Sequence, residues 1–553
     1  MRPQRRSRTA LWLGLACIAG SVAACANEPG SDSRDTPGRS ETVDSGDPVE
    51  LRVLAGSELA DLEPILAEAA DATGVTTTFD FVGTLEGVEQ VIAGAVDGRY
   101  DAIWFSSNRY LGLHPGAARR VRQETRIMTS PVILGMTTAK ARDLGWADRT
   151  DVTWSDIADA AARGRFTYGM TNPATSNSGF SALVAVAAAL SGTGAALEPR
   201  DIDAAATDLR GFFSAQKLTA GSSGWLADAF AARSRGEQPG VVVDGLINYE
   251  SVLLSLNDEG GLREPLTLVY PADGVVTADY PLTLLRSASD DARNGYQRLV
   301  DHLLLPDVQA DIMRTTHRRP AAPGVEPEQR FGPATLVELP FPAKLDVVDG
   351  LVDTYFDRLR RPVRTVYVLD VSGSMEGDRI AELRAALVGL TGADDTLASR
   401  SRQFHPREEI TLLPFDDAPL EPESFEVPEG GGDQVLARLR SASEALEIGG
   451  DTAIYDSMIR AYDLLGGVEG RDSAPSIVLM TDGENNTGAA LADFVDHHRH
   501  LPSALRTVPI FVVLFGEANV DEMEQLAGIT GGRTFDARTG RLETAFQEIR
   551  GYQ

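Results

Sequence analysis

The sequence contains almost no cysteine, with only Cys17 and Cys25 among its 553 residues. Both lie in the first 25 residues, so the sequence beyond them can hold neither a disulfide nor a thiolate metal site. Histidine is also scarce, with seven residues, and there are 51 basic residues against 81 acidic ones. The net charge of −30 argues against binding to nucleic acid or to anionic lipid by charge.

A long apolar run is also missing beyond the amino terminus, so we predict no membrane-spanning helix there. The first 24 residues combine four arginines with the apolar run Leu11–Ala24, which is typical of a secretory signal. The segment Val22-Ala23-Ala24-Cys25 resembles a bacterial lipobox. That resemblance implies a lipid on Cys25 and anchoring at the extracytoplasmic face of the cell membrane. An ordinary signal peptide with a chance cysteine is the alternative.

The length of the chain predicts two or three domains. Residues 25–48 are rich in Ser, Asp, Gly, Pro and Glu and have too few apolar side chains for a core, so we expect a disordered tether. The expected organisation is a signal peptide over 1–24, that tether over 25–48, a folded region over 49–319, a proline-rich linker with a short helix over 320–362, and a second folded region over 363–553.

The most informative stretch is Thr365–Met375, in which an apolar run leads to Asp370-x-Ser372-x-Ser374. The apolar run, with its β-branched and aromatic residues, predicts a strand buried on both faces. Open α/β sheets bind their ligands at the carboxyl ends of such strands. We therefore expect one carboxylate and two hydroxyls to be presented together at that edge.

Two later stretches add oxygen atoms to the same expected edge. A glycine-rich loop delivers Thr452 at the start of a helix, and a second apolar strand, Ser476–Thr481, ends beside Asp482. Carboxylates and hydroxyls are hard oxygen ligands of the kind that Mg²⁺ prefers. We therefore predict a site for Mg²⁺, or alternatively Mn²⁺ or Ca²⁺, at Asp370, Ser372, Ser374, Thr452 and Asp482.

These five positions resemble, in type and order, the metal-ion-dependent adhesion site of von Willebrand factor type A domains. The resemblance covers about residues 364–553. It implies a doubly wound, Rossmann-like α/β sheet with the site at its upper edge and with direct ligation of the ion by the two serines. A partner protein would supply a carboxylate to the open position of the ion. The additional Asp451 departs from the shorter Gly-Gly-Thr form, and the ligand is assigned to Thr452.

Residues 49–318 show alternating strand and helix signals, which predict parallel β-α-β units. The expected first helix carries Leu59, Leu62, Ile65, Leu66 and Ala69 on one face. Small polar residues over 171–179 lead into a helix expected over 180–190, whose free backbone N–H groups suit an anion or a polar oxygen. A plain helix cap is the alternative.

This region resembles the two-lobed extracellular solute-binding proteins of ABC transporters, in the sulfate, molybdate and phosphate group. The matching features are the Gly56-Ser57 loop, the segment Ser130–Leu134 as a crossover between lobes, and the segment Val269–Leu282. The resemblance implies a type II periplasmic-binding-protein fold. It also implies a pocket between the lobes that binds a small solute or anion and is lined by Ser57, Ser107, Ser176, Asn177 and Ser178, with Asn248, Tyr249 and Glu250 facing them. An oxyanion, a neutral solute, a peptide, or no ligand at all remain open.

We find no Gly-x-Ser-x-Gly elbow, no Walker loop and no positioned base for a serine nucleophile, so we expect no enzyme activity. The expected function is that of a lipid-anchored surface protein that captures a protein partner through a metal ion. One alternative is a substrate-binding component of an ABC transporter with an accessory type A domain. Another is a type A domain that assists the assembly of a metal-dependent enzyme complex.

Overall fold

The computed structural model describes residues 47–258, 260–392, 397–466, 472–516, 519–538 and 542–552. The expected signal peptide, Cys25 and all but the last two residues of the expected tether lie outside these ranges. Within them, no helix has both the length and the apolar character needed to cross a bilayer.

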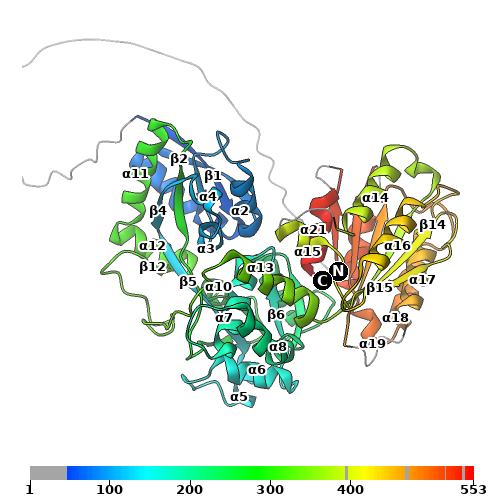
Figure 1. Ribbon diagram of the computed structural model, residues 1–553, viewed down its shortest axis with the longest axis horizontal. Helices are drawn as coiled ribbons and strands as arrows, with labels where there is room; N and C mark the ends of the chain where they lie inside the picture. The colour runs from blue at the N-terminus through cyan, green and yellow to red at the C-terminus, as the bar shows by residue number, and fades with distance from the viewer. Residues whose placement is uncertain are drawn as a thin grey trace, which may run out of the picture. The chain divides into compact units, whose positions relative to one another are not determined.

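The first lobe is built on a five-stranded sheet with the order β2-β1-β3-β11-β4. The strand β1 is parallel to both of its neighbours, whereas β11 is antiparallel to both of its own. Figure 1 shows this sheet in blue and green with helices α2 and α11 beside it. The strands are β1 (Val49–Gly56), β2 (Val75–Val82), β3 (Ala102–Trp104), β4 (Val121–Arg126) and β11 (Pro281–Leu285). The helices are η1 (Ser57–Leu62), α1 (Glu63–Thr73), α2 (Thr84–Ala93), α3 (Arg109–Gly112), α4 (Pro115–Ala118), α11 (Asp290–Leu303) and α12 (Pro306–Thr316).

The first expected helix is present, and the apolar face predicted for it is buried at all five positions, Leu59, Leu62, Ile65, Leu66 and Ala69. The structure divides it into the 3₁₀ turn η1 and the α-helix α1. Pro64 stands in the first turn of α1, where its missing N–H costs no helical hydrogen bond.

The second lobe has a sheet with the order β10-β5-β8-β6-β7, and both β9 and β12 also pair with β5. Its strands are β5 (Met128–Thr137), β6 (Tyr168–Thr171), β7 (Gln216–Ala220), β8 (Gly245–Tyr249), β9 (Leu266–Val269), β10 (Thr277–Ala278) and β12 (Arg319–Pro320). Its helices are α5 (Thr138–Asp143), α6 (Trp154–Ala162), α7 (Asn177–Ser191), α8 (Pro199–Phe213), α9 (Ser223–Arg235) and α10 (Glu250–Asp258).

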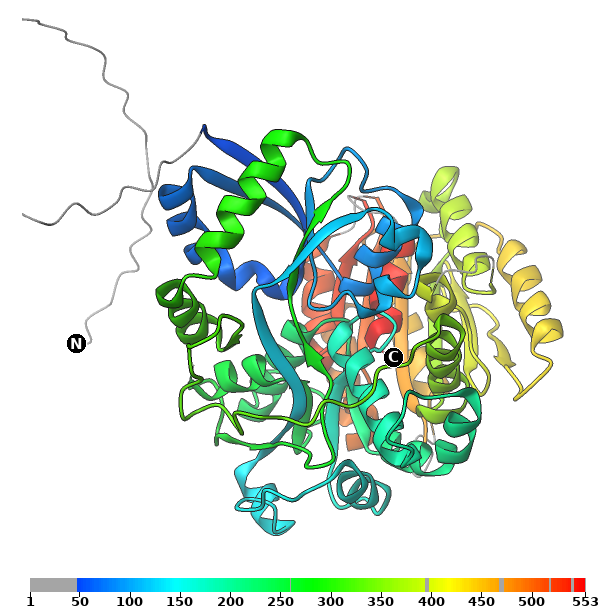
Figure 2. The ribbon, with the colours of Figure 1, turned by 60° about the vertical axis from the view of Figure 1, so that its left-hand side comes forward.

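The chain passes between the lobes along extended strands. Only Ile127 separates β4, in the first sheet, from β5, in the second, and Figure 2 shows the two as one cyan ribbon. The chain returns between β10 and β11 through Asp279 and Tyr280. The predicted crossover over Ser130–Leu134 is therefore present, with the actual crossing point a few residues earlier.

The predicted linker over 320–362 is not a free spacer. It contains α13 (Leu345–Thr354) and the helical turn η2 (Tyr355–Leu359), whose apolar side chains belong to the same core as the two lobes. The Tyr355 hydroxyl also donates a hydrogen bond to Gln216 Oε1 at 3.2 Å. The second half of this segment therefore packs as part of the first folded region.

The third sheet has the order β15-β14-β13-β16-β17-β18 and is parallel except for the pair β14–β15. Its strands are β13 (Val363–Asp370), β14 (Glu409–Phe415), β15 (Glu423–Glu426), β16 (Ala474–Thr481), β17 (Ile510–Leu514) and β18 (Arg533–Asp536). Its helices are η3 (Gly373–Met375), α14 (Asp378–Gly389), α15 (Leu397–Arg402), α16 (Asp433–Glu444), α17 (Ile454–Leu464), α18 (Leu491–His500), α19 (Ser503–Arg506), α20 (Val520–Thr530) and α21 (Leu542–Tyr552). The short edge strand β15 lies in the acidic segment 422–432.

Helices cover both faces of this sheet, as the sequence predicts. Along the central strand β13, Tyr367 and Leu369 join a core with residues of α14, α16 and α21. The alternate residues Val366 and Val368 join a second core with residues of α17, α18 and α20. Because successive side chains of a strand point to opposite faces, this division explains the continuous apolar run.

Candidate functional site

The carboxyl ends of β13 and β16 meet at one edge of the third sheet because the two strands are parallel neighbours. Asp370 is the last residue of β13, and Asp482 follows the last residue of β16. Four of the five predicted metal ligands, Asp370, Ser372, Thr452 and Asp482, are at most 3% exposed. Ser374 is exposed, so the site opens to solvent on its side.

Hydrogen bonds connect the predicted ligands directly. The backbone N–H of Ser372 donates to Asp370 Oδ1 at 2.9 Å, and the hydroxyls of Ser372 and Ser374 lie 3.0 Å apart. The Ser374 hydroxyl donates in turn to Asp482 Oδ1 at 2.8 Å. The structure therefore brings Asp370, Ser372, Ser374 and Asp482 together, although they come from the ends of two different strands and the turns that follow them.

Glycines bring Thr452 to the same place. Gly450 has φ +44°, in the left-handed region that favours glycine, and its carbonyl accepts a hydrogen bond from Gly373 N at 3.1 Å. A Cβ on Gly483 would lie 3.6 Å from Ser374 Oγ and 3.8 Å from Thr452 Oγ1. The hydroxyls of Thr452 and Ser374 therefore both lie close to Gly483. The neighbouring Asp451, by contrast, is exposed to solvent.

Residues that sequence reasoning did not single out hold these ligands in place. The Thr481 hydroxyl donates to Asp370 Oδ2 at 2.6 Å. Asn486 Oδ1 accepts from Thr452 N at 2.8 Å, and Asn486 N donates back to Thr452 O at 3.0 Å. The side chain of Arg379 donates to Asp482 Oδ2. A hydroxyl or amide next to the metal motif is the only sequence signal that could have indicated Thr481 and Asn486.

The electrostatics of the site suit a cation. Burial raises the pKa of Asp370, hydrogen bonds from Ser372 and Thr481 oppose that rise, and the nearby Asp482 adds to it. Two buried carboxylates so close together favour a positive charge between them. Among the described residues, no three His, Cys, Asp or Glu side chains converge as metal ligands. The predicted set has only two such side chains, and three hydroxyls complete it, so the residues fit a hard divalent ion.

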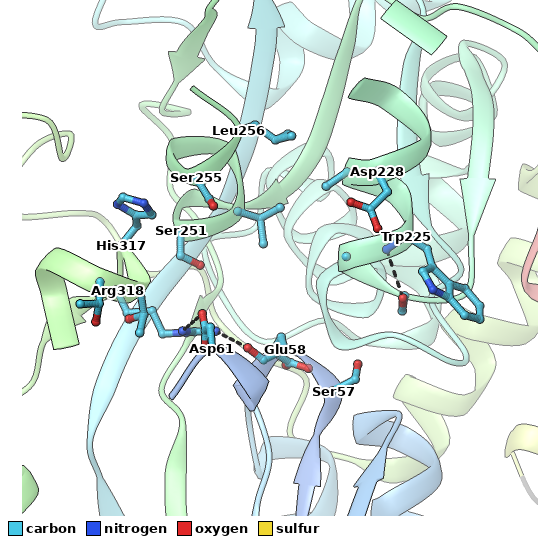
Figure 3. A pocket seen from close by; sticks show the side chains of 16 residues that line it. Ser57, Glu58, Asp61, Trp225, Asp228, Ser251, Ser255, Leu256, His317 and Arg318 are labelled. Atoms are coloured by element: carbon cyan, nitrogen blue, oxygen red, sulfur yellow. Dashed lines mark hydrogen bonds and ion pairs between the residues drawn. The ribbon is translucent and has the colours of Figure 1, made fainter. Parts of the chain in front are cut away.

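A second candidate site is a cavity of about 450 Å³ that residues of both lobes line. Figure 3 shows Ser57, Glu58 and Asp61 on one side and Trp225, Asp228, Ser251 and Ser255 on the other. Ser57 is the one member of the predicted pocket among the lining residues.

The other predicted pocket residues are buried and bonded to neighbouring polar groups. The Ser178 hydroxyl lies 2.7 Å from Ser223 Oγ and 3.3 Å from Ser176 Oγ, and Asn177 Nδ2 donates to the Tyr249 hydroxyl at 3.1 Å. The Ser107 hydroxyl accepts from Arg109 N at 3.3 Å. The hydroxyls and amides at the start of α7 are thus bonded to other groups of the protein, as is Ser107, and the role of all four residues in binding a solute remains a prediction.

The residues expected on the facing strand have mainly structural partners. Asn248 Nδ2 donates to the carbonyl of Ser223 at 3.1 Å. The fully buried Glu250 accepts two hydrogen bonds from Arg319, at 2.6 and 2.8 Å. The Tyr249 ring lies 6.1 Å from that of Tyr280, and its hydroxyl interacts with the Glu58 carboxylate, which lines the cavity.

Most of the ionisable side chains that line the cavity are acidic. The cavity is lined by Glu58, Asp61 and Asp228, and burial raises the pKa of Glu58. Arg318 is the lining guanidinium, and its groups donate to Asp61 Oδ2 at 2.6 Å and to the Glu58 carbonyl at 2.8 Å. It also lies over the Tyr280 ring, 4.9 Å from the centroid. The Arg318 guanidinium is therefore already bonded to groups of the protein itself.

Comparison with known families divides the chain at the same place as the fold. Residues 128–335 match the model for bacterial extracellular solute-binding proteins, and residues 366–548 match the model for the von Willebrand factor type A domain. The chain thus combines these two modules. Human inter-alpha-trypsin inhibitor heavy chain H4 is 29% identical over 132 residues, which span 23% of this chain and 13% of that protein.

Several solved structures are similar to the two-lobed region. The periplasmic binding protein AfuA from Actinobacillus pleuropneumoniae, solved with fructose-6-phosphate, is 15% identical and aligns with 56% of this chain and 98% of its own, with a TM-score of 0.42. Iron-bound HitA from Pseudomonas aeruginosa is 17% identical, with coverages of 55% and 97% and a TM-score of 0.43. The sulfate-binding protein SubI from Mycobacterium tuberculosis H37Rv is 17% identical, with coverages of 50% and 88% and a TM-score of 0.38.

Proposed function

We propose that this chain, which joins a bacterial extracellular solute-binding region to a von Willebrand factor type A domain, is a cell-surface protein that captures a protein partner through a divalent cation. The function is binding without chemical turnover. The observation that carries the proposal is the hydrogen-bonded set Asp370, Ser372, Ser374 and Asp482, with the Thr452 hydroxyl beside it.

Each residue has a defined task in this proposal. Asp370, Ser372, Ser374, Thr452 and Asp482 would hold Mg²⁺, or alternatively Mn²⁺ or Ca²⁺, and the bound ion would supply a Lewis-acid position for a carboxylate of the partner. Thr481 holds Asp370 by its hydrogen bond, and Asn486 holds the backbone of Thr452. The exposed Ser374 marks the side from which a partner approaches.

A pull-down from detergent-solubilised membranes of the source cells tests this function. We expect the wild-type chain to retain a protein partner with Mg²⁺ present and to lose it with EDTA or with Thr452→Ala. Asp451→Ala is the matched control, since the neighbouring carboxylate is exposed. A partner retained by Thr452→Ala and in EDTA would contradict capture through the ion.

The anchor is part of the same proposal. Attachment of lipid to Cys25 would hold the protein at the extracytoplasmic face of the cell membrane, with residues 26–48 as the tether. Mass spectrometry of the protein from its source cells should find a diacylglyceryl group on Cys25. An unmodified amino terminus generated by cleavage elsewhere would contradict the anchor.

A second candidate function is capture of a small solute in the cavity between the lobes, as the binding component of a transporter. The lining by Glu58, Asp61 and Asp228, with Arg318 already paired, favours an organic cation or a neutral polar solute over an oxyanion. Thermal-shift assays with panels of organic amines and of oxyanions test this. Stabilisation by the oxyanions alone would contradict it, and no shift with either panel would favour a scaffold role for the lobes.

A further inference from the structure

Arg379, the second residue of α14, extends its side chain back to the metal-ligand set. Its Nη1 donates to Asp482 Oδ2 and also to the Ser374 carbonyl, the latter at 3.2 Å. The other Asp482 oxygen accepts from the Ser374 hydroxyl at 2.8 Å. In this arrangement, both oxygens of the proposed ligand Asp482 are engaged by groups of the protein.

A glycine leaves room for this guanidinium beside the site. Gly516 follows β17 with φ +55°, and a Cβ on it would lie 2.7 Å from Arg379 Cζ. A larger residue at position 516 would therefore require the guanidinium to move. The side chain of Arg379 is 38% exposed and that of Asp482 is 0% exposed, so the cation covers the buried carboxylate from the solvent side.

The ion pair between Arg379 and Asp482 partly balances the negative charge of the site. Asp370 and Asp482 are buried close together, and within the described part of the chain Arg379 is the basic residue that forms an ion pair with either of them. Leaving two buried carboxylates without a cation is costly, so the guanidinium stabilises the site when no ion is bound. A divalent ion placed a few ångströms from a guanidinium is repelled by it.

We propose that Arg379 is a built-in counter-ion that holds Asp482 in the metal-free protein and must release it when a divalent ion binds. This inference rests on the metal site proposed above and concerns its regulation. Arg379 thereby weakens metal binding, so that the site fills only at higher ion concentrations. The released guanidinium lies at the exposed rim of the site.

Calorimetric titration of Mg²⁺ into the full chain tests the proposal with Arg379→Gln. We expect this variant to bind Mg²⁺ at least tenfold more tightly than the wild type. Arg384→Gln is the matched control, because Arg384 lies on the same helix and bonds to the Leu446 carbonyl. We expect its affinity to stay within twofold of the wild type.

The outcomes separate the two proposals. No Mg²⁺ binding by the wild type or by either variant would remove the proposed metal site itself. Binding by the wild type with an unchanged or weaker affinity in Arg379→Gln would overturn the counter-ion role and leave the metal site standing.

A second measurement needs no substitution. Phenylglyoxal labelling of the wild-type chain, read by peptide mass spectrometry, should modify Arg379 severalfold faster with Mg²⁺ than with EDTA. The labelling of Arg384 should not change. Equal labelling of Arg379 in both conditions, with Mg²⁺ bound, would show that the guanidinium stays on Asp482 and would overturn the proposal.

Discussion

Thr481 decides how the buried carboxylate of Asp370 is oriented. Its hydroxyl donates to Asp370 Oδ2, and the backbone of Ser372 holds the other oxygen. Hydrogen bonds to a ligating side chain from outside the ligand set typically change metal affinity by about 10- to 100-fold. We therefore expect Thr481→Val, which removes only the hydroxyl, to weaken Mg²⁺ binding about tenfold in calorimetric titration.

The control for this prediction is Thr365→Val, which removes another hydroxyl that bridges β13 and β16. The Thr365 hydroxyl lies 3.0 Å from Ser476 Oγ, several residues from the carboxyl ends of β13 and β16. That variant should lose about 1 kcal/mol of folding free energy and keep its affinity for Mg²⁺. Equal affinities for Thr481→Val and the wild type would mean that the hydroxyl does not orient the ligand.

At the scale of one element, α7 depends on a glycine at its start. A Cβ on Gly179 would lie 2.1 Å from the Thr171 carbonyl oxygen, so α7 and β6 pack at a distance that only glycine allows. We expect Gly179→Ala to cost about 1–3 kcal/mol of folding free energy, measured by urea denaturation. Gly224→Ala on α9 is the control, since its Cβ would meet nothing within 4 Å. A neutral Gly179→Ala would contradict this packing.

A buried ion cluster fastens η2 and α21 to the third sheet. Glu408, just before β14, accepts hydrogen bonds from both Arg360 and Arg550, and all three are at most 5% exposed. Burial alone would raise the pKa of Glu408, but Arg550 and Arg360 lower it overall. Removing this charge takes away the carboxylate that the two buried guanidinium groups share. We expect Glu408→Gln to cost about 3–5 kcal/mol of folding free energy at pH 7.

The lowered pKa fixes the direction of the pH dependence. The contribution of Glu408 is fully present above the ordinary glutamate pKa of about 4.3 and is lost as the pH falls through the lower folded-state pKa. The stability difference between wild type and Glu408→Gln should therefore shrink in urea denaturation below about pH 4. Glu409→Gln, which breaks a more exposed pair with Arg364, should cost less than about 1 kcal/mol. A difference that stays constant down to pH 3 would contradict the lowered pKa.

At the scale of the whole molecule, the contacts tie the two modules into one unit over residues 45–553. The Trp225 ring, in the second lobe, stacks on the Tyr552 ring of α21, with centroids 5.7 Å apart. The Arg533 guanidinium, on β18, lies 3.4 Å from the centroid of the Trp225 ring. We expect a single calorimetric unfolding transition in the wild type that Trp225→Ala divides into two. Trp225→Phe, which keeps a ring, should preserve one transition. Two transitions already present in the wild type would show that these contacts do not couple the modules.

The sequence was sufficient to predict the parts of the molecule that depend on local pattern. The apolar run before Asp370 predicted a strand buried on both faces, and its alternate residues do divide between two cores. The meeting of the five ligand candidates could be expected because two of them follow predicted buried strands and all five resemble the type A metal site in type and order. Ser57 lies among the residues that line the cavity between the lobes, and its role in binding a solute stays a prediction.

What could not be predicted depends on contacts between distant segments. Arg379 pairs with a carboxylate 103 residues away, and Thr481 bonds to one 111 residues away. The polar residues at the start of α7 looked available for a ligand, but Ser178 bonds to Ser223 from a different helix. Hydroxyls and guanidinium groups accept many partners, so sequence alone does not show which one they find.

The claim on which the account depends is that five oxygen-bearing side chains share one divalent ion at the edge of the third sheet. Calorimetric titration of Mg²⁺ into the full chain, wild type beside Asp370→Ala, tests it most directly, with circular dichroism to confirm that both are folded. We predict one bound ion per wild-type chain and at least a hundredfold loss of affinity in the variant. The same affinity in both proteins would contradict the account.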